Sequence, residues 1–152
     1  MPRIERHARV VWEGSLARGG GAISAGSSGA FTGLRYSNAT RIGVPEGNTS
    51  PEELLAAAHA ACFTNSLAAV LSGGGTPPGT IETHCLIVMD EVAGEGHRIV
   101  GSQITLEASI EGIEQDAFAE AVTTADEGCP FSALLKAAGA SVAFEARLTV
   151  PR

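Results

Sequence analysis

The 152-residue sequence predicts an α+β fold in which mostly antiparallel sheets surround a long central buried helix. The first observation is an uncharged run over residues 54–72, which is long and apolar enough for a core helix. The second is the alternation of apolar and polar residues in segments on both sides of this run, which is typical of strands. The length suits one domain, so we expect residues 1–152 to form a single domain.

The N-terminal third predicts short strands separated by glycine-rich turns. Residues 7–12 form the first expected strand, residues 18–21 a turn, and residues 22–25 a strand that pairs back on the first. Residues 31–36 predict another short strand. Residues 38–48 contain glycines and a proline, so we expect a loop there.

The central helix has a clear start and a clear end. Ser50 suits the N-cap, Pro51 the first helical position and Glu53 the third. We expect the helix to run to about Leu71, a length of about 30 Å, because three glycines from Gly73 end it. It is apolar nearly all round and needs cover on several sides. One chain with few large side chains provides little of that cover, which is a first indication of a dimer.

The C-terminal half predicts two strands, two helices and a last strand, over residues 80–93, 98–111, 116–125, 131–138 and 141–150. Apolar residues alternate from Ile104 to Ile110 in the second of these strands and from Val142 to Val150 in the last. Gly139 stands where a helix C-cap is expected.

Charge and composition exclude some classes of function. The net charge of −7 argues against a nucleic-acid or anionic-membrane binder, because both need a basic face. Charges interrupt the N-terminus early, so no secretory signal is expected. A membrane span over residues 54–72 is less favoured than a core helix, because polar residues interrupt the run. Three cysteines do not make a secreted disulfide framework, and we expect a cytoplasmic protein.

The cysteines differ in their sequence settings. Cys62 lies in the middle of the central helix, where a cysteine usually packs as a small hydrophobe. Cys129 precedes Pro130 at the start of a short helix, where backbone N–H groups and the helix dipole would stabilise a thiolate. The carboxylates of Asp126 and Glu127 would oppose that thiolate. A small residue at a tight break accounts for Cys129 equally well.

Other site chemistries have weaker signals. His59 and Cys62 share a helix face, but no CxxC or HxxxH pair is present, so we expect no metal site and no thioredoxin-like centre. His84 and Cys85 point to opposite faces of a strand. No glycine-rich run has phosphate-loop spacing, which argues against nucleotide binding.

Two cysteine motifs resemble those of the OsmC/Ohr family, the osmotically inducible protein C and organic hydroperoxide resistance proteins. The first is residues 48–63, which read NTSPEELLAAAHAACF, and the second is residues 128–132, which read GCPFS. Residues 12–14 and 38–41 resemble the OsmC branch rather than the Ohr branch. The resemblance extends over nearly the whole chain.

The resemblance implies a thiol peroxidase that reduces organic hydroperoxides to alcohols, built as an intertwined homodimer with active sites at the subunit interface. It implies that Cys62 is the peroxidatic cysteine and Cys129 the resolving one, and that Arg41 and Glu52 are the charged pair around the reactive thiol. Cys85 matches no redox position of the family and is expected to be structural. No bound cofactor is expected, and an external dithiol of the lipoyl type would reduce the disulfide.

These roles are chemically consistent. Burial raises the pKa of a thiol, so Cys62 needs a cation to become a nucleophile, and Arg41 can supply one. Glu52 would orient the guanidinium through a bidentate pair. An apolar entrance would favour alkyl hydroperoxides, and the candidates for it are Phe63, Phe131 and Met89.

The spacing of Glu52 and Cys62 favours a composite site. Ten residues separate them on one expected helix, which puts their backbones about 15 Å apart along the axis, beyond the reach of a Glu side chain. Glu52 is therefore expected to serve the site of the partner chain, unless the helix is kinked.

Two other interpretations stay open. The first is a non-enzymatic protein on the same fold that binds a small ligand or senses redox state. The second is a structural dimer with incidental cysteines. The presence of Cys62, Cys129, Arg41 and Glu52 together favours the enzyme, because a binding protein does not need all four.

Overall fold

The structure is a computed structural model that describes residues 2–149 and divides the chain into two compact units. The first unit ends at Pro51 and the second begins at Glu52. Each unit is described separately. The prediction of a single domain stays a prediction.

The first unit is a three-stranded antiparallel sheet followed by a short helix. Its strands are β1 (Ala8–Glu13), β2 (Gly20–Ala25) and β3 (Leu34–Tyr36), in the order β1-β2-β3. The predicted pairing of the first two strands is confirmed, with Ala8 opposite Ala25 and Glu13 opposite Gly20. A Cβ on Gly21 would lie 2.3 Å from the ring of Tyr36, so any larger residue at this strand position would displace that ring.

The predicted loop over residues 38–48 is wrong at its start, where helix α1 (Asn38–Ile42) forms. Ser37 is its N-cap: its hydroxyl accepts a hydrogen bond from the N–H of Thr40, and the Thr40 hydroxyl accepts one from the N–H of Ser37. This reciprocal capping satisfies two N–H groups of a helix too short to show an apolar period. Arg41 lies in its last turn.

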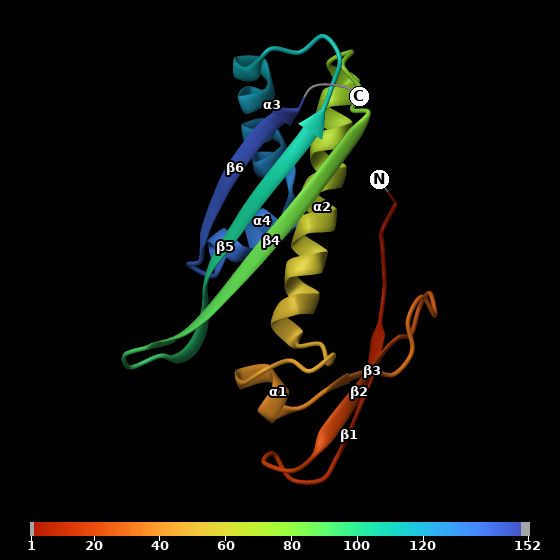
Figure 1. Ribbon diagram of the computed structural model, residues 1–152, viewed down its shortest axis with the longest axis vertical. Helices are drawn as coiled ribbons and strands as arrows, with labels where there is room; N and C mark the ends of the chain where they lie inside the picture. The colour runs from red at the N-terminus through yellow and green to blue at the C-terminus, as the bar shows by residue number, and fades with distance from the viewer. Residues whose placement is uncertain (1, 150–152) are drawn as a thin grey trace. The chain divides into compact units, whose positions relative to one another are not determined.

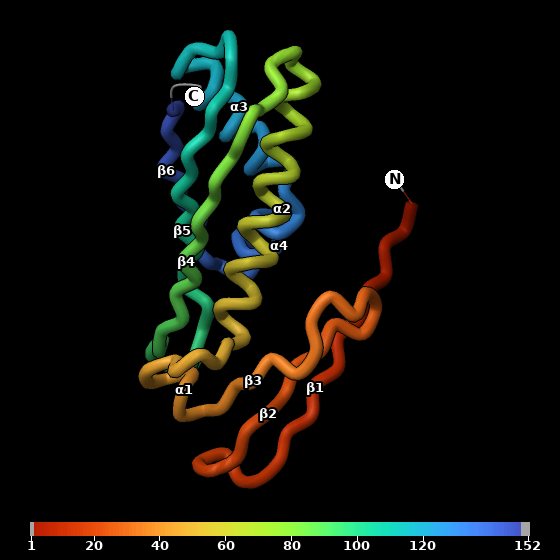
Figure 2. Tube along the Cα trace, turned by 45° about the vertical axis from the view of Figure 1, so that its right-hand side comes forward, coloured from red at the N-terminus to blue at the C-terminus, as the bar shows by residue number. Residues whose placement is uncertain are grey.

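The second unit packs three helices against one sheet. In chain order it consists of α2 (Pro51–Gly73), β4 (Thr80–Val92), β5 (Gly96–Ser109), α3 (Gln115–Gly128), α4 (Pro130–Ala137) and β6 (Ser141–Thr149). The sheet order is β4-β5-β6, with β4 antiparallel and β6 parallel to β5. Figures 1 and 2 show α2, α3 and α4 on the same side of this sheet. The predicted order of elements and the α+β class are confirmed.

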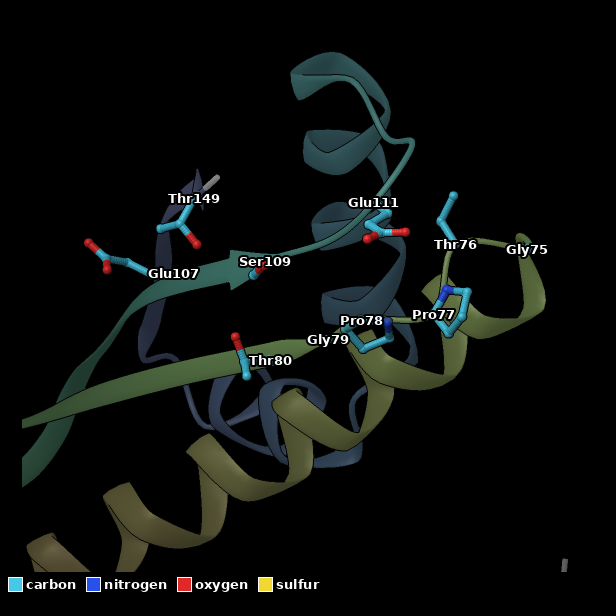
Figure 3. Close-up of a pocket in the computed structure, with 10 residues that line it drawn as sticks. All are labelled: Gly75, Thr76, Pro77, Pro78, Gly79, Thr80, Glu107, Ser109, Glu111 and Thr149. Atoms are coloured by element: carbon cyan, nitrogen blue, oxygen red, sulfur yellow. The ribbon is translucent and has the colours of Figure 1, made fainter. Parts of the chain in front are cut away.

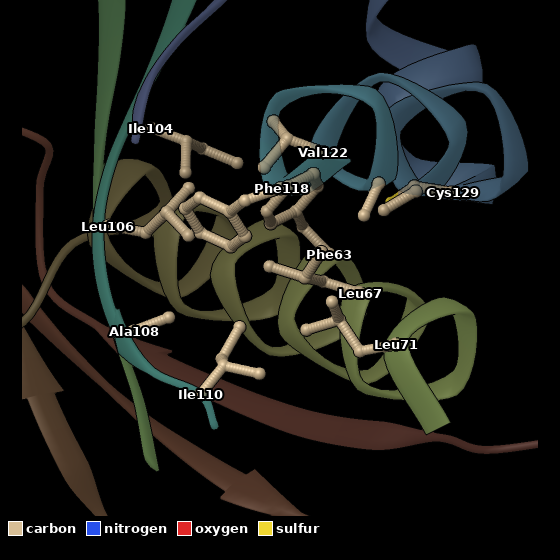
Figure 4. Packing of buried hydrophobic residues seen from close by; sticks show 12 residues of the cluster. Phe63, Leu67, Leu71, Ile104, Leu106, Ala108, Ile110, Phe118, Val122 and Cys129 are labelled. Atoms are coloured by element: carbon tan, nitrogen blue, oxygen red, sulfur yellow. The ribbon is translucent and has the colours of Figure 1, made fainter. Parts of the chain in front are cut away.

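The core lies between this sheet and the helices, as Figure 4 shows. The predicted alternation in β5 is confirmed, because Ile104, Leu106 and Ala108 are all buried against the helices. Phe118 of α3 and Phe63 of α2 are fully buried among them. In β6 the predicted apolar face from Val142 to Leu148 is half-buried, and Val150 lies outside the described residues.

The long helix α2 buries one stripe of side chains. The buried residues recur at every fourth position, as expected for one face of a helix, and they are His59, Phe63, Leu67 and Leu71. The other faces are half-buried or exposed, with small residues at Ala57, Ala61 and Ala69. By length and composition alone α2 could cross a membrane, but a core helix passes the same test, and α2 supplies part of the core.

Candidate functional site

The structure brings the two predicted redox cysteines together in the second unit. Cys62 is half-buried near the middle of α2, and Cys129 is fully buried at the junction of α3 and α4. Both are free thiols, and a hydrogen bond joins their side chains. Cys129 is the N-cap of α4, as predicted, but its side chain makes no capping hydrogen bond.

The surroundings of Cys62 act on its pKa in both directions. Burial raises the pKa of Cys62, as the sequence predicts, and so do the hydrogen bond with Cys129 and the charge of a Cys129 thiolate. The backbone N–H of Phe131 forms a hydrogen bond that lowers the pKa of Cys62. The sum is a raised pKa, so the groups of this unit do not by themselves make Cys62 a thiolate at neutral pH.

The N–H groups at the start of α4 act on a different thiol from the one predicted. The sequence predicts that they favour a thiolate at Cys129. Phe131, at the second position of α4, directs its N–H to the sulfur of Cys62 instead. The N-terminal turn of α4 thus favours negative charge on the cysteine of the neighbouring helix.

A buried hydrogen-bond network lies beside the two thiols, and the sequence did not indicate it. The His59 ring is hydrogen bonded on both sides: its Nδ1 lies 2.8 Å from Ser102 Oγ and its Nε2 lies 2.9 Å from Ser132 Oγ. All three side chains are fully buried. Cys85 joins them, with its sulfur 3.3 Å from Ser102 Oγ. We call these four residues the His59 network.

The charge state of the His59 network follows from its burial. Burial lowers the pKa of His59; the charge of Asp126 raises it to a smaller extent, and that of Lys136 lowers it. The imidazole is therefore neutral at neutral pH, with one donor and one acceptor nitrogen, and both have a serine partner. Burial also raises the pKa of Cys85, which keeps it a thiol and agrees with its expected structural role.

An ion pair ties the two short helices together around Cys129. Lys136 of α4 donates a hydrogen bond to the carboxylate of Asp126 in the last turn of α3. The two residues bracket the helix junction in sequence, so the ion pair restrains the segment that carries Cys129.

The two charged residues implied by the family resemblance lie in different units. Arg41 is in α1 of the first unit, and Glu52 is in the first turn of α2. The helix is continuous from Pro51 to Gly73, as Figure 1 shows, so no break shortens the path from Glu52 to Cys62. About 15 Å along the helix axis separates their backbones within one chain.

The three residues expected at an apolar entrance have different settings. Phe63 is a core residue: it is fully buried, and its ring centroid lies 4.7 Å from that of Phe144. Helical geometry places Phe63 on the α2 face that packs against the sheet, and its assignment to an entrance stays a prediction. Phe131 is half-buried next to Cys129, and Met89 is half-buried at an irregularity in β4.

One hollow of the second unit is separate from the thiols. It is about 800 Å³ in volume and lies beyond the C-terminal end of α2, as Figure 3 shows. Its lining mixes polar and apolar groups and includes Glu107, Glu111 and the prolines Pro77 and Pro78. Neither Cys62 nor Cys129 lines it. Among residues 2–149, no group of three His, Cys, Asp or Glu side chains gathers as a metal site requires.

The family profile of OsmC-like proteins matches residues 44–145, a range that contains both cysteine motifs. The chain is also 36% identical to Peroxiredoxin OsmC of Escherichia coli over 134 residues, which cover 88% of this chain and 92% of the relative. The chain belongs to the OsmC family. This result confirms the family resemblance, and the identity to Peroxiredoxin OsmC of Shigella flexneri is the same.

Solved structures of OsmC-family proteins share the fold. An organic hydroperoxide resistance protein OsmC from Legionella pneumophila aligns with a TM-score of 0.69 at 21% identity and covers 98% of this chain and 99% of its own. The organic hydroperoxide resistance protein OhrB of Bacillus subtilis aligns with a TM-score of 0.65 at 23% identity, with 94% and 98% coverage. At these identities the likeness shows the OsmC fold alone.

The sequence does not predict the His59 network, because its members are far apart in the chain. Ser102 and Ser132 are 43 and 73 residues from His59. One signal was available: Ser102 is the polar member of the otherwise apolar face that continues through Ile104 and Leu106. A buried polar residue in such a face needs a hydrogen-bond partner, and a histidine on the buried stripe of α2 is the matching group.

Proposed function

We propose that this OsmC-family protein is a thiol peroxidase that reduces organic hydroperoxides through a disulfide cycle of Cys62 and Cys129. The observation that carries the proposal is the proximity of two free thiols at the N-terminus of α4, where Cys129 is close enough to act on the pKa of Cys62. The name of the Escherichia coli relative, Peroxiredoxin OsmC, supports the peroxidase activity. The names of the Legionella and Bacillus proteins support organic hydroperoxides as the substrate class.

The first step is the attack of the Cys62 thiolate on the terminal oxygen of the hydroperoxide. An S–O bond forms, the O–O bond breaks, and the alkoxide takes up a proton to leave as the alcohol. Cys62 is oxidised to a sulfenic acid. The Phe131 N–H favours the thiolate, and the guanidinium of Arg41 offsets the effect of burial and stabilises the developing negative charge.

The second step closes the disulfide. The sulfur of Cys129 attacks the sulfur of Cys62, the S–S bond forms, and the S–O bond breaks with loss of water. The hydrogen bond between the thiols supports this step, because the two sulfurs are already neighbours. An external dithiol of the lipoyl type then reduces the disulfide by two exchanges and is itself oxidised.

The active form proposed here is a homodimer with sites at the subunit interface. Two observations support it. The described chain leaves much of the apolar helix α2 incompletely covered, including Ala57, Ala61 and Ala69. The continuous path of α2 also prevents Glu52 from reaching Cys62 of the same chain, so Glu52 would orient Arg41 at the partner's thiol.

Mass spectrometry of the intact protein tests the cycle. The reduced protein is treated with one equivalent of tert-butyl hydroperoxide, with Cys62→Ser, Cys129→Ser and Cys85→Ser measured in parallel. We expect the loss of two hydrogens, mapped to a Cys62–Cys129 bridge. Cys129→Ser stops at a sulfenic acid, Cys62→Ser does not react, and the matched control Cys85→Ser behaves as wild type.

A wild-type chain that stays reduced at stoichiometric hydroperoxide would contradict the proposal. The small-ligand-binding interpretation would then be the better one. A bridge that includes Cys85 would keep the peroxidase but overturn the assignment of the resolving cysteine.

A further inference from the structure

We propose that His59 is a positioning residue for the thiol pair: by its hydrogen bond to Ser132 it fixes the first turn of α4 on α2, and so holds Cys129 opposite Cys62. This inference rests on the proposed two-cysteine function. His59 takes part in neither chemical step of the proposed cycle, and its hydrogen bonds indicate a role in holding the structure around the thiols.

The position of the hydrogen bond is the first argument. His59 lies three residues before Cys62 on α2, and Ser132 lies three residues after Cys129 in α4. The 2.9 Å contact between His59 Nε2 and Ser132 Oγ therefore joins the same two helices as the thiol pair, just under one turn away. Any displacement of the α4 turn that separates the sulfurs would also have to stretch this contact.

The second argument is that the ring is itself held. Its Nδ1 lies 2.8 Å from the hydroxyl of Ser102, which belongs to β5, the central strand of the sheet. A histidine bonded only to Ser132 could swing with α4, whereas one bonded at both nitrogens is fixed between the sheet and the helix. His59, Ser102 and Ser132 are fully buried, so bulk water does not compete for these hydrogen bonds.

The third argument is the geometric demand of the chemistry. A disulfide requires Cα atoms about 4.4–6.8 Å apart and a defined torsion about the S–S bond. Cys129 sits at a helix junction, a place where the backbone lacks the continuous hydrogen bonds of a helix interior. The Asp126–Lys136 ion pair restrains α3 against α4, and the contact of His59 with Ser132 adds a restraint between α4 and α2 that does not involve the reacting thiols.

A purely stabilising histidine would have different consequences. Removing either serine hydroxyl would leave one ring nitrogen of His59 without its serine partner and would lower the stability of the fold, and Ser102→Ala would also remove a partner of the Cys85 thiol. Loss of the Ser132 contact would release α4 directly, whereas loss of the Ser102 contact would leave the bond between α2 and α4 in place. Ser102→Ala is therefore the matched control for Ser132→Ala.

The test is peroxide-free. Each protein is equilibrated with reduced and oxidised dithiothreitol at several ratios, and the fraction of Cys62–Cys129 disulfide is measured by mass spectrometry after acid quenching. We expect Ser132→Ala to lower the equilibrium constant for disulfide formation about tenfold and Ser102→Ala to lower it by a smaller factor. Urea unfolding of the reduced proteins is expected to show a stability loss at least as large for Ser102→Ala as for Ser132→Ala, because Ser102 also bonds Cys85.

A second pair of variants keeps the shape of residue 132 constant. Ser132→Thr retains the hydroxyl and should stay near the wild-type equilibrium, whereas Ser132→Val lacks the hydroxyl and should follow Ser132→Ala. Equal equilibrium constants for Ser132→Ala and Ser102→Ala, or for the Thr and Val variants, would overturn the inference. A wild-type protein that forms the bridge with dithiothreitol but is not oxidised by hydroperoxide would instead contradict the proposed function.

Discussion

The backbone N–H of Phe131 donates a hydrogen bond to the sulfur of Cys62, so the N-terminus of α4 is directed at a thiol that belongs to α2. The hydrogen bond favours the thiolate, while burial and the neighbouring Cys129 oppose it. The balance is a raised pKa, which makes the reactivity of Cys62 dependent on what is added to or removed from its surroundings.

Removing the second thiol should make Cys62 more acidic. In Cys129→Ala, both effects of Cys129 that raise the pKa of Cys62 are lost, while the Phe131 hydrogen bond remains. The pH profile of Cys62 alkylation by iodoacetamide should therefore shift to lower pH than in wild type. Cys85→Ala is the control and should leave the profile in place. A profile unchanged in Cys129→Ala would show that the two thiols do not interact.

Removing the proposed cation should have the opposite effect. In Arg41→Met we expect the Cys62 alkylation profile to shift to higher pH and kcat for tert-butyl hydroperoxide to fall on the order of 100-fold. The reason is the loss of a charge that favours the thiolate and stabilises the reacting oxygens. Arg9→Met, at an exposed position of β1, serves as the control. Full activity in Arg41→Met would exclude a role for this side chain in the peroxidase step.

Mixed dimers decide whether Glu52 acts across the interface. Subunits with Cys62→Ser and subunits with Glu52→Gln are each expected to be inactive or strongly impaired alone. If Glu52 serves the partner's thiol, each mixed dimer regains one intact site, because the Glu52→Gln subunit supplies Cys62 and the other supplies Glu52. Peroxidase activity is measured after refolding the two variants together. Mixtures no more active than the separate variants would place Glu52 in the site of its own chain.

Truncation of Phe63 should affect stability rather than substrate choice. Phe63→Ala is expected to lower the free energy of unfolding by about 3–5 kcal/mol, because it removes a fully buried ring that contacts Phe144. Leu86, which is 55% exposed on the outer face of β4, is the control, and Leu86→Ala should cost less than about 1 kcal/mol. Urea titration followed by circular dichroism measures both. A small loss in Phe63→Ala would mean that Phe63 is not a core residue in solution.

The neutral state of His59 predicts a pH dependence of stability. Its pKa is lowered in the folded state, so the unfolded chain binds a proton more readily once the pH falls below about 6.5. The stability that His59 contributes is present above that pH and is lost as the pH falls toward the folded-state pKa. Urea unfolding at pH 7.5 and 5.5 should show a smaller difference in His59→Gln than in wild type. His84→Gln, an exposed variant, should retain the wild-type difference.

The sequence predicted those helices and strands whose start, end or periodicity is encoded by neighbouring residues. The run from Ser50 to Glu53 and the glycines from Gly73 predicted both ends of α2, and alternation predicted the strands of the second sheet. Helix α1 was missed because one helical turn has no period, and its cap pairs Ser37 with a threonine rather than a glutamate. The parallel pairing of β5 with β6 could not be predicted from the sequence, because alternation predicts a strand but not which strand it pairs with.

For the candidate site too, the sequence predicted only the residues that lie in recognisable local motifs. Motif resemblance indicated Cys62 and Cys129, and the structure places them side by side in one unit. Settings that depend on long-range packing could not be predicted. His59 needs partners from two distant segments, and the burial of Phe63 follows from its register on α2 and from the sheet that covers this face.

The parallel pairing of β6 with β5 also has a consequence for the synthesis of the chain. The helices α3 and α4, with Cys129 between them, form the crossover that connects these two strands. The α4 end of this crossover is fixed to the sheet only when β6, the last described element, has paired with β5. We therefore expect a nascent chain to carry Cys62 in a helix well before its partner thiol is held opposite, and the dithiol site to be complete only after β6 has left the ribosome and paired with β5.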